Sequence, residues 1–300
     1  MSIILSTPSV DELPPAVDAL KRWQHDGGPL QLHSGDLGWH SLRGAEATAA
    51  DLRMWLHDGV VHAIGLLDGP ELVRMAVAPD WRDDEALARR LAADLDAPGR
   101  VLDPDGATVE ARGAQRLTQL LLERGWERDE PWTTFHRCLS DPVQDCGLRI
   151  ETIESDRAEV WVGVHWFAFR GSPFTDADRH RTVGRWLAMA GGPFYADARC
   201  LAAFDQGGEA VAVAAVWSAG PGRPGLLEPM GVHQSHRGHG YGTAITLAAA
   251  AALRDMGSSS ASVCVESSNV GAVATYASAG FTPSAEVTDL RRRTAGWKAS

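Results

Sequence analysis

The chain has 300 residues, 44% of them hydrophobic, and a formal net charge of −11 at pH 7. This length suits two domains with buried cores, while the negative charge argues against a nucleic acid or an anionic membrane surface as partner. No stretch approaches the roughly 18 to 20 apolar residues of a membrane span, and the first residues lack the basic segment of a secretory signal. Four scattered cysteines without a C-x-x-C pair predict reduced thiols, so we expect a cytoplasmic protein.

The first half of the chain predicts an alternation of strands and helices. Two apolar stretches, 60–67 and 71–77, flank turn residues and predict a β-hairpin. A helix, a strand, a helix and a closing strand are expected next, at 86–95, 107–111, 114–123 and 133–138. The segment 140–147 contains Pro, Asp and Gly without apolar periodicity, so it predicts a linker that divides the chain into 1–140 and 141–300.

The second half predicts the order β-α-α-β-β-β-α-β-α-β. Apolar or helical patterns between turn residues mark its first seven elements, at 148–153, 157–169, 175–189, 200–204, 210–217, 226–232 and 244–254. A buried strand is expected at 259–265, because β-branched and small residues dominate there. The next helix is bounded by Asn269, which suits an N-cap, and by Gly280, which suits the position after the last turn.

Three glycines, Gly238, Gly240 and Gly242, separate a strand from an Ala-rich helix in the sequence V-H-Q-S-H-R-G-H-G-Y-G-T at 232–243. Glycine leaves the backbone uncovered, so consecutive N–H groups can point at one anion, and the following helix adds the positive end of its dipole. Arg237 adds a fixed positive charge beside them. The segment therefore predicts a cradle for a pyrophosphate group.

Two familiar pyrophosphate motifs do not fit this cradle. Its spacing is G-x-G-x-G rather than G-x-G-x-x-G, and the lysine of a P-loop is missing because the chain has no lysine between Lys21 and Lys298. The segment resembles instead the R/Q-x-x-G-x-G/A motif of the GNAT superfamily of acyl-CoA N-acyltransferases. Arg237, Gly240 and Gly242 fill its defining positions.

A later segment resembles the second motif of the same family, N-x-x-A-x-x-x-Y-x-x-x-G-F. Five residues match its defined positions: Asn269, Ala272, Tyr276, Gly280 and Phe281. The two motifs stand in the family's order and separation, and the resemblance covers residues 148–290. It implies an α/β (α+β) fold of two tandem GNAT-like domains, each with a mixed, mostly antiparallel central sheet flanked by helices.

The first half looks like a degenerate copy of the same domain, since 77–87 falls in register with 232–242. Asp83, Asp84 and Glu85 stand where the second copy has Gly238, His239 and Gly240, and three carboxylates there would repel a diphosphate. Leu121 occupies the place of Tyr276. We therefore expect residues 1–140 to be non-catalytic, to wall the substrate cleft and to bury apolar surface of the catalytic domain, residues 141–300.

The resemblance implies acetyl-CoA as co-substrate, without a metal. The residues expected to contact it come from the two motifs and the strand before them: Met230, Val232, His233, Arg237, Gly238, His239, Gly240, Tyr241, Gly242, Thr243, Asn269 and Tyr276. His233, His236 and His239 form an H-x-x-H-x-x-H pattern that could also suggest a metal. No acidic or cysteine residue adjoins it in the sequence, so contact with phosphate or solvent is the favoured interpretation.

In the family's reaction a neutral amine attacks the acyl thioester, with a base, a donor to the thioester oxygen and an acid for the leaving thiolate. Tyr276 stands at the family's acid position, and a phenol of unperturbed pKa near 10 can donate to a thiolate. Its alternative role is packing on the helix face. Glu228 interrupts an apolar strand and is our candidate base. Its alternative is a carboxylate satisfied by arginine or solvent.

The acceptor is expected to be the primary amine of a small molecule. Residues proposed to bind it are aromatic or acidic: Trp166, Phe169, Phe174, Asp176, Trp217 and Glu228. Core packing is the alternative for the aromatic residues, and charges that complement a helix dipole are the alternative for Asp176 and Asp178.

The tandem arrangement resembles mycothiol synthases and uncharacterised actinobacterial GNAT proteins, and an aminoglycoside-type acetyltransferase is also open. An alternative of another class is a non-catalytic, CoA-binding regulatory protein. The protein is expected to be a monomer or a homodimer.

Overall fold

The structure is a computed structural model, and it describes residues 2–97, 99–102, 106–170 and 172–292. The last eight residues of the predicted second domain, 293–300, lie outside this part. The described elements of the first half are β1 (Ile3–Ser6), α1 (Leu13–Trp23), α2 (Ser34–His40), α3 (Ala45–Asp51), β2 (Leu52–His57), β3 (Val60–Leu67), β4 (Leu72–Val77), α4 (Glu85–Asp96), β5 (Ala107–Glu110), α5 (Gln115–Glu123) and β6 (Glu127–Cys138).

The second half follows the predicted order of elements, except that two strands follow the last helix where one was predicted. They are β7 (Arg149–Thr152), α6 (Ala158–Phe169), α7 (Asp176–Ala190), β8 (Ala198–Phe204), β9 (Ala210–Trp217), β10 (Gly225–Val232), α8 (Tyr241–Asp255), β11 (Ser260–Glu266), α9 (Val270–Ser278), β12 (Thr282–Pro283) and β13 (Val287–Arg292). Each predicted strand and helix of the chain is confirmed, with ends shifted by a few residues. Sequence patterns missed β1, β2 and α1 to α3, and placed the start of β6 six residues late.

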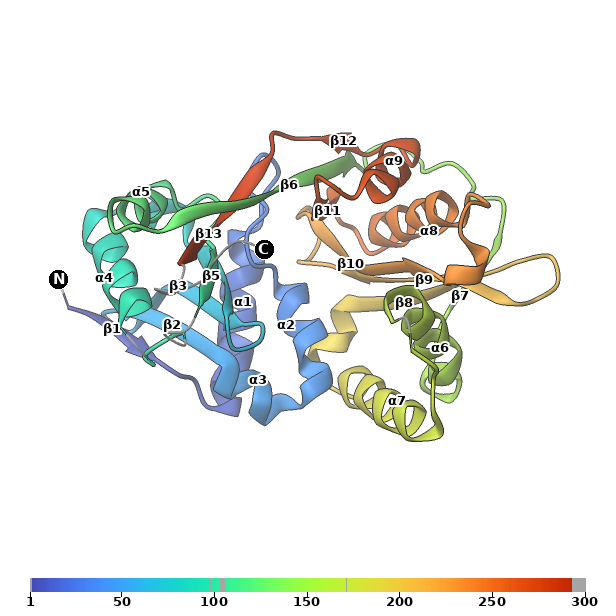
Figure 1. Cartoon of the computed structure of the whole chain (residues 1–300), viewed down its shortest axis with the longest axis horizontal. Helices are drawn as coiled ribbons and strands as arrows, with labels where there is room; N and C mark the ends of the chain where they lie inside the picture. The colour runs from blue at the N-terminus through green and yellow to red at the C-terminus, as the bar shows by residue number, and fades with distance from the viewer. Residues whose placement is uncertain (1, 98, 103–105, 171, 293–300) are drawn as a thin grey trace.

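The strands form one mixed sheet that runs through both halves of the molecule (Figure 1). Their order is β1-β2-β3-β4-β5-β13-β6-β11-β10-β9-β8-β7, with β12 paired to β6. Helices pack against the sheet in four groups. Two of these groups belong to the first half, one formed by α4 and α5 and the other by α1 and α2. The groups of α8 with α9 and of α6 with α7 belong to the second. The fold is therefore the predicted mixed α/β architecture.

The two halves exchange their closing strands. Strand β6 belongs to the first half by sequence, yet it pairs with β11 from Ser260↔Cys138 to Glu266↔Trp132. Strand β13, from the end of the described chain, pairs with β5 of the first half through Leu290↔Val109. A cut between residues 140 and 141 would separate β6 from β11, so each half completes the sheet of the other.

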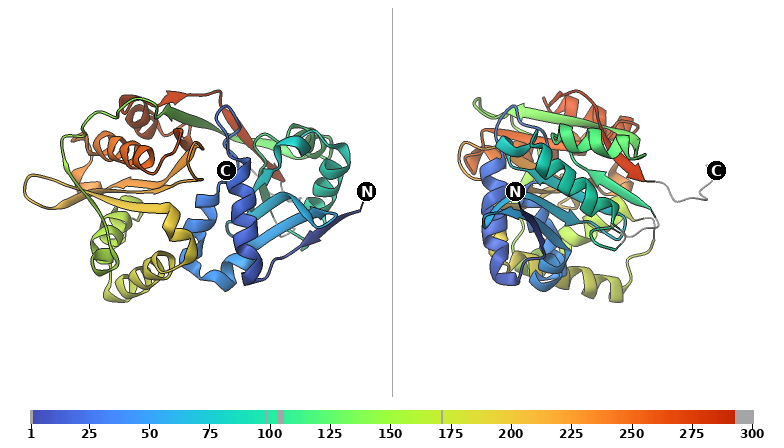
Figure 2. Two further views of the ribbon diagram at one scale, coloured as in Figure 1. Left: turned by 180° about the vertical axis from the view of Figure 1, so that it is seen from behind. Right: turned by 90° about the vertical axis from the view of Figure 1, so that its left-hand side faces the viewer.

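Helix α2 packs closely against the second half, and Figure 2 shows α1 and α2 where the halves meet. Gly35 and Gly38 of α2 lie against Trp217 of β9. A Cβ atom at Gly38 would stand 2.2 Å from Cζ3 of Trp217, so only glycine permits this approach. Among the described residues, no helix is both long enough and apolar enough to cross a membrane.

Candidate active site

The glycine segment between β10 and α8 has the conformation that an anion cradle requires. Gly238 and Gly240 adopt left-handed backbone angles, with φ of +83° and +79°, which other residues adopt only at a cost. The first backbone hydrogen bond of α8 runs from Ala244 N to Gly240 O. The N–H groups of residues 241–243 therefore have no acceptor within the helix and stand at its positive end.

A cleft of about 570 Å³ opens at this helix end, between β10 and α9. Nine predicted cofactor residues line it: Met230, Val232, Arg237, Gly238, Gly240, Tyr241, Gly242, Thr243 and Asn269. Asn269 also caps α9, where its Oδ1 accepts from Ala272 N at 3.1 Å. A Cβ atom at Gly242 would stand 3.1 Å from Cγ2 of Thr275, so this glycine lets α8 approach α9. The cradle and the α9 motif thus form one cleft.

The three histidines of the H-x-x-H-x-x-H pattern go to different places. His233 accepts a hydrogen bond from Ser235 N, and His239 Nδ1 lies 3.0 Å from the carbonyl of Arg237; neither lines the cleft. His236 lines it and pairs with Glu209 at 3.4 Å. The pattern therefore does not gather three imidazoles on one ion. In the described chain, the possible ligand group here consists of Asp205, Glu209 and His236, near the turn between β8 and β9.

A second cavity begins where β10 and β11 diverge. These parallel strands pair only at Gly225↔Ala261 and Leu226↔Ser262, and the register of β10 against β9 shifts between Leu227 and Met230. Beyond that point lies a cavity of about 560 Å³, lined by Glu228 of β10 and Tyr276 of α9. It shares four lining residues with the cofactor cleft, so the two spaces adjoin: Phe169, Met230, Asn269 and Ala272.

Tyr276 is buried, with 6% of its surface exposed, and packs against Phe135 and Phe281 at ring distances of 5.6 and 6.2 Å. Burial raises the pKa of its hydroxyl, and the negative charge of Glu228 raises it further. The phenol is therefore neutral at physiological pH and available as a hydrogen-bond donor. The packing alternative and the acid role both remain compatible with this position.

Glu228 stands at the end of an ion-pair network that comes from the first half. Its Oε1 lies 3.4 Å from Nη1 of Arg74 on β4, and its side chain is 40% exposed. Arg74 also lies 2.8 Å from Oδ1 of Asp36 and 3.3 Å from Oε2 of Glu110. Burial raises the pKa of Asp36 to about 7, against the attraction of Arg74. Glu228 is thus both paired with an arginine and open to the cavity.

Sequence reasoning missed these partners of Glu228, because Arg74, Asp36 and Glu110 belong to no local motif. They come from β4, α2 and β5, and only the packing of the halves brings them to β10. An arginine inside a predicted strand was the one signal available, since a charged residue in such a strand needs a partner.

Two of the six predicted acceptor residues, Phe169 and Glu228, line this cavity. Trp166 is buried, donates from Nε1 to Ser172 O at 3.0 Å and stacks on Phe174. Asp176 begins α7 with its side chain 95% exposed, where it complements the helix dipole. Trp217 is buried under α2 and donates to the carbonyl of Glu228 at 2.9 Å, so it supports the strand from behind.

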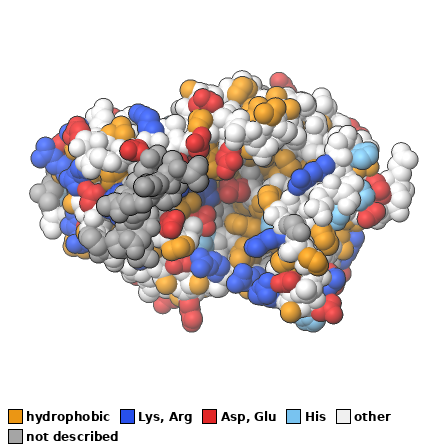
Figure 3. All heavy atoms as spheres, in the orientation of Figure 1, with side chains coloured by type: hydrophobic (Ala, Val, Ile, Leu, Met, Phe, Trp, Pro, Cys, Tyr) orange, Lys and Arg blue, Asp and Glu red, His pale blue; other side chains and the backbone are white. Residues whose placement is uncertain are grey.

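The cavity at Glu228 is acidic and lies between the two halves. Six carboxylates and two guanidinium groups line it: Asp68, Glu110, Asp129, Glu228, Glu266 and Asp289, with Arg74 and Arg112. Figure 3 shows the molecule hollowed between its halves, with acidic side chains beside the hollow. Because carboxylates outnumber guanidinium groups, the cavity favours a cationic ligand.

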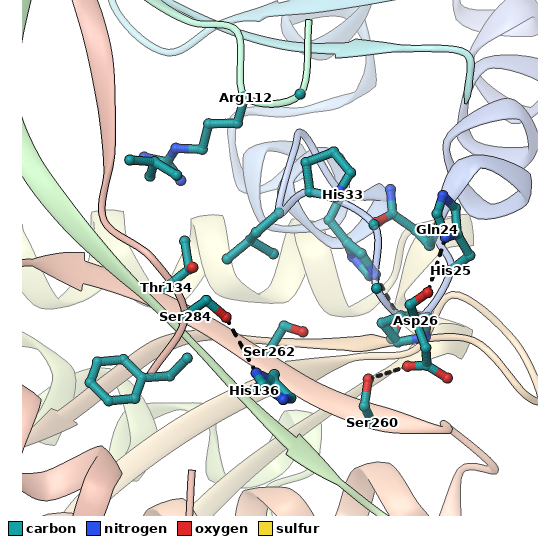
Figure 4. Close-up of a pocket in the computed structure, with 18 of the residues that line it drawn as sticks. Gln24, His25, Asp26, His33, Arg112, Thr134, His136, Ser260, Ser262 and Ser284 are labelled. Atoms are coloured by element: carbon teal, nitrogen blue, oxygen red, sulfur yellow. Dashed lines mark hydrogen bonds between the residues drawn. The ribbon is translucent and has the colours of Figure 1, made fainter. Parts of the chain in front are cut away.

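A third cavity, of about 740 Å³, is larger than these two but contains none of the predicted site residues (Figure 4). Its lining includes serines of β11 and the loop after α1. Ser260 donates to Asp26 Oδ1 at 2.7 Å, and Ser284 Oγ lies 3.4 Å from His136 Nδ1. Size alone therefore does not identify the active site, which we place where the two sequence motifs converge.

Comparison with known proteins identifies the class to which this cleft belongs. The model of the acetyltransferase (GNAT) family matches residues 161–281. The mycothiol acetyltransferase of Thermobispora bispora is 30% identical over 222 residues, which are 71% of this chain and 73% of that protein. The chain therefore belongs to the GNAT family of acetyltransferases, whose members transfer acyl groups from acyl-CoA.

Solved structures extend the likeness to the whole chain. A tandem GNAT protein from the clavulanic acid biosynthesis pathway superimposes with a TM-score of 0.63 at 20% identity and covers 97% of this chain and 98% of its own. An acetyltransferase from Colwellia psychrerythraea gives a TM-score of 0.58 at 15% identity with the same coverage. At these identities the likeness shows the fold, which is a tandem GNAT arrangement.

Proposed function

We propose that the protein is an acetyl-CoA-dependent N-acetyltransferase that acetylates the primary amine of a small molecule. The observation that supports this most is the junction of the two spaces at Met230, where the anion cradle meets the acidic cavity that holds Glu228 and Tyr276. A diphosphate at α8 would direct the acyl end of the cofactor toward that junction.

In the proposed reaction Glu228 accepts, directly or through water, the proton that the ammonium group must lose before attack. The amine nitrogen then forms a bond to the thioester carbon, and the backbone of β10, where it diverges from β11, is the candidate donor to the carbonyl oxygen. As the carbon–sulfur bond breaks, the nitrogen releases its second proton to solvent, and Tyr276 donates a proton to the thiolate and later regains one from solvent. The products are the N-acetyl amide and free CoA.

The first half contributes walls rather than reacting groups in this proposal. Strands β4 and β5 supply Arg74 and Glu110 to the acceptor cavity, while residues 141–300 supply the cradle, Glu228 and Tyr276. We therefore propose that residues 1–140 act as a non-catalytic domain and residues 141–300 as the catalytic one, with β6 and β13 exchanged between them.

A screen of primary amines that measures free CoA release tests the proposal. Wild-type protein should release CoA with at least one small cationic amine, and Glu228→Gln should lower turnover while acetyl-CoA affinity is unchanged. Unchanged turnover in that variant would show that Glu228 is not the base. Acetyl-CoA binding by calorimetry without turnover on any amine would instead support a non-catalytic, CoA-binding protein.

A further inference from the structure

The acceptor cavity holds more negative charge than its arginines compensate. Arg74 is shared by Asp36, Glu110 and Glu228, and Arg112 lies 3.4 Å from Glu110 Oε2 and 3.3 Å from Asp289 Oδ2. Each guanidinium group thus already serves at least two carboxylates. A single reacting amine at Glu228 would still leave the lining with more carboxylates than cationic groups.

Asp289 of β13 is a buried carboxylate of this lining that is paired through only one of its two oxygens. Its side chain is 8% exposed and lines the cavity, and its Oδ2 faces Arg112. Its Oδ1 is buried and has no hydrogen-bond partner among the described residues. Leaving a buried carboxylate oxygen unpaired costs free energy, which a donor from a bound molecule would offset. Burial also raises the pKa of this carboxyl to about 6, consistent with a missing cation.

Asp129 of β6 lies beside Asp289 across the strand pair. The register of β13 against β6 shifts between Thr288↔Pro131 and Leu290↔Arg128, which places Asp289 opposite the segment that contains Asp129. Asp129 also lines the cavity, and its Oδ1 lies 3.6 Å from Arg291 Nη1. The two carboxylates therefore form one acidic wall.

This wall is separate from Glu228. In the sheet, β6 and β11 stand between β13 and β10, so the backbones of β13 and β10 are about 14 Å apart at ordinary strand spacing. Side chains that reach into the cavity from both walls shorten the gap between their charges. One extended molecule with a cation at each end could contact both walls.

We infer that the acceptor carries a second, non-reacting ammonium group held by Asp289 and Asp129, and so is a diamine or a longer polyamine. This inference rests on the proposed function, because the first amine is the one acetylated at Glu228. The second ammonium stays charged through the reaction, donates to the unpaired Oδ1 of Asp289 and sets the position of the reacting amine.

The test compares 1,6-diaminohexane with hexylamine, which differ only in the second ammonium group. By calorimetry at low salt, wild-type protein should bind the diamine at least about tenfold more tightly. Asp289→Asn keeps the shape of the side chain and should remove most of that preference, measured as the ratio of the diamine and hexylamine affinities. Asp18→Asn, on the exposed face of α1, is the matched control and should bind both amines like wild type.

Circular dichroism verifies the fold of each variant, and Asp129→Asn serves as a second variant if Asp289→Asn does not fold. Equal affinity of wild-type protein for the two amines, or no binding of either, overturns the inference, as does a diamine preference that survives in the folded variants. CoA release with both amines at equal kcat/KM would overturn it while upholding the proposed function. Selective diamine binding without any CoA release would support the second ammonium site and contradict the proposed acetyltransferase function.

Discussion

The N-termini of α4 and α8 occupy equivalent places in the two halves. They differ in the groups that stand there, which are carboxylates at α4 and uncovered backbone N–H groups at α8. Each helix follows a strand and a short 3-10 turn. At α8, glycine backbone and free N–H groups face an open cleft. At α4, Asp84 caps the helix, with its Oδ1 accepting from Leu87 N at 2.7 Å, and Glu85 pairs with Arg89 and Arg116. At the position that corresponds to the glycine cradle, the first half therefore has carboxylates of its own.

The strands that precede the two helices, β4 and β10, also differ, because a segment of the chain lies along β4 and no described segment lies along the corresponding part of β10. Met75 of β4 stands in register with Met230 of β10, and its carbonyl accepts a hydrogen bond from Leu32 N at 3.1 Å. Gln31 Oε1 accepts from Val77 N at 3.2 Å. The segment before α2 thus lies along β4, whereas the corresponding edge of β10 borders the two adjoining cavities. We therefore propose that the first half excludes a diphosphate in two ways, by the carboxylates at α4 and by the segment that lies along β4.

The largest expected effect comes from giving α8 the chemistry of α4. Gly240→Asp puts a carboxylate where the diphosphate is proposed to lie, and it forces an aspartate into a left-handed backbone conformation. The affinity for acetyl-CoA should therefore fall more than about 100-fold. Isothermal titration measures it, and wild-type protein should show one site per chain. Gly59→Asp is the matched control, since Gly59 also has a positive φ and open space around it. Retained affinity in Gly240→Asp would place the cofactor elsewhere.

Tyr276→Phe gives α9 an apolar side chain, as Leu121 gives α5. We expect kcat to fall about 10- to 1,000-fold, because the hydroxyl acts on charge that develops only at the leaving sulfur. The dissociation constant for acetyl-CoA should change little, because the ring and its packing remain. Steady-state kinetics and calorimetry separate these effects. A kcat within about twofold of wild type would assign Tyr276 to packing alone.

A substitution at Asp36 tests the ion-pair network through which the first half contacts Glu228. Its pKa rises from 3.8 to about 7 in the folded protein, so between these values the folded state binds a proton that the unfolded chain releases. Its contribution to the free energy of unfolding therefore declines as pH rises from about 4 to 7. Asp36→Asn should gain stability relative to wild type over this range in urea unfolding. A relative loss at higher pH would mean that Arg74 keeps the carboxylate ionised.

The smallest effect is expected from making α4 resemble α8. Replacing Asp83, Asp84 and Glu85 by Gly, His and Gly should cost about 0.5 to 2 kcal/mol of stability through the lost cap. It should not create a second acetyl-CoA site, because the segment at Gln31 and Leu32 still occupies the edge of β4. Thermal unfolding and titration give the two results. Two acetyl-CoA sites per chain in this variant would show that the carboxylates at α4 alone prevent the first half from binding the cofactor.

The sequence by itself determined the features that depend on neighbours along the chain. The left-handed glycines, the cap at Asn269 and the left-handed Gly280 after α9 follow from local backbone chemistry. The alternation of strands and helices follows from hydrophobic periodicity. The order of the two motifs then sufficed to predict the family and the fold.

Only the tertiary structure decided which groups meet across the two halves. The exchange of β6 and β13, the contact of Arg74 with Glu228 and the burial of Trp217 under α2 join residues more than 120 positions apart. No local pattern encodes such contacts, because they depend on which faces pack together. The aromatic residues of α6 illustrate this, since the same spacing serves a core or a pocket, and packing buried Trp166 while leaving Phe169 at the cleft.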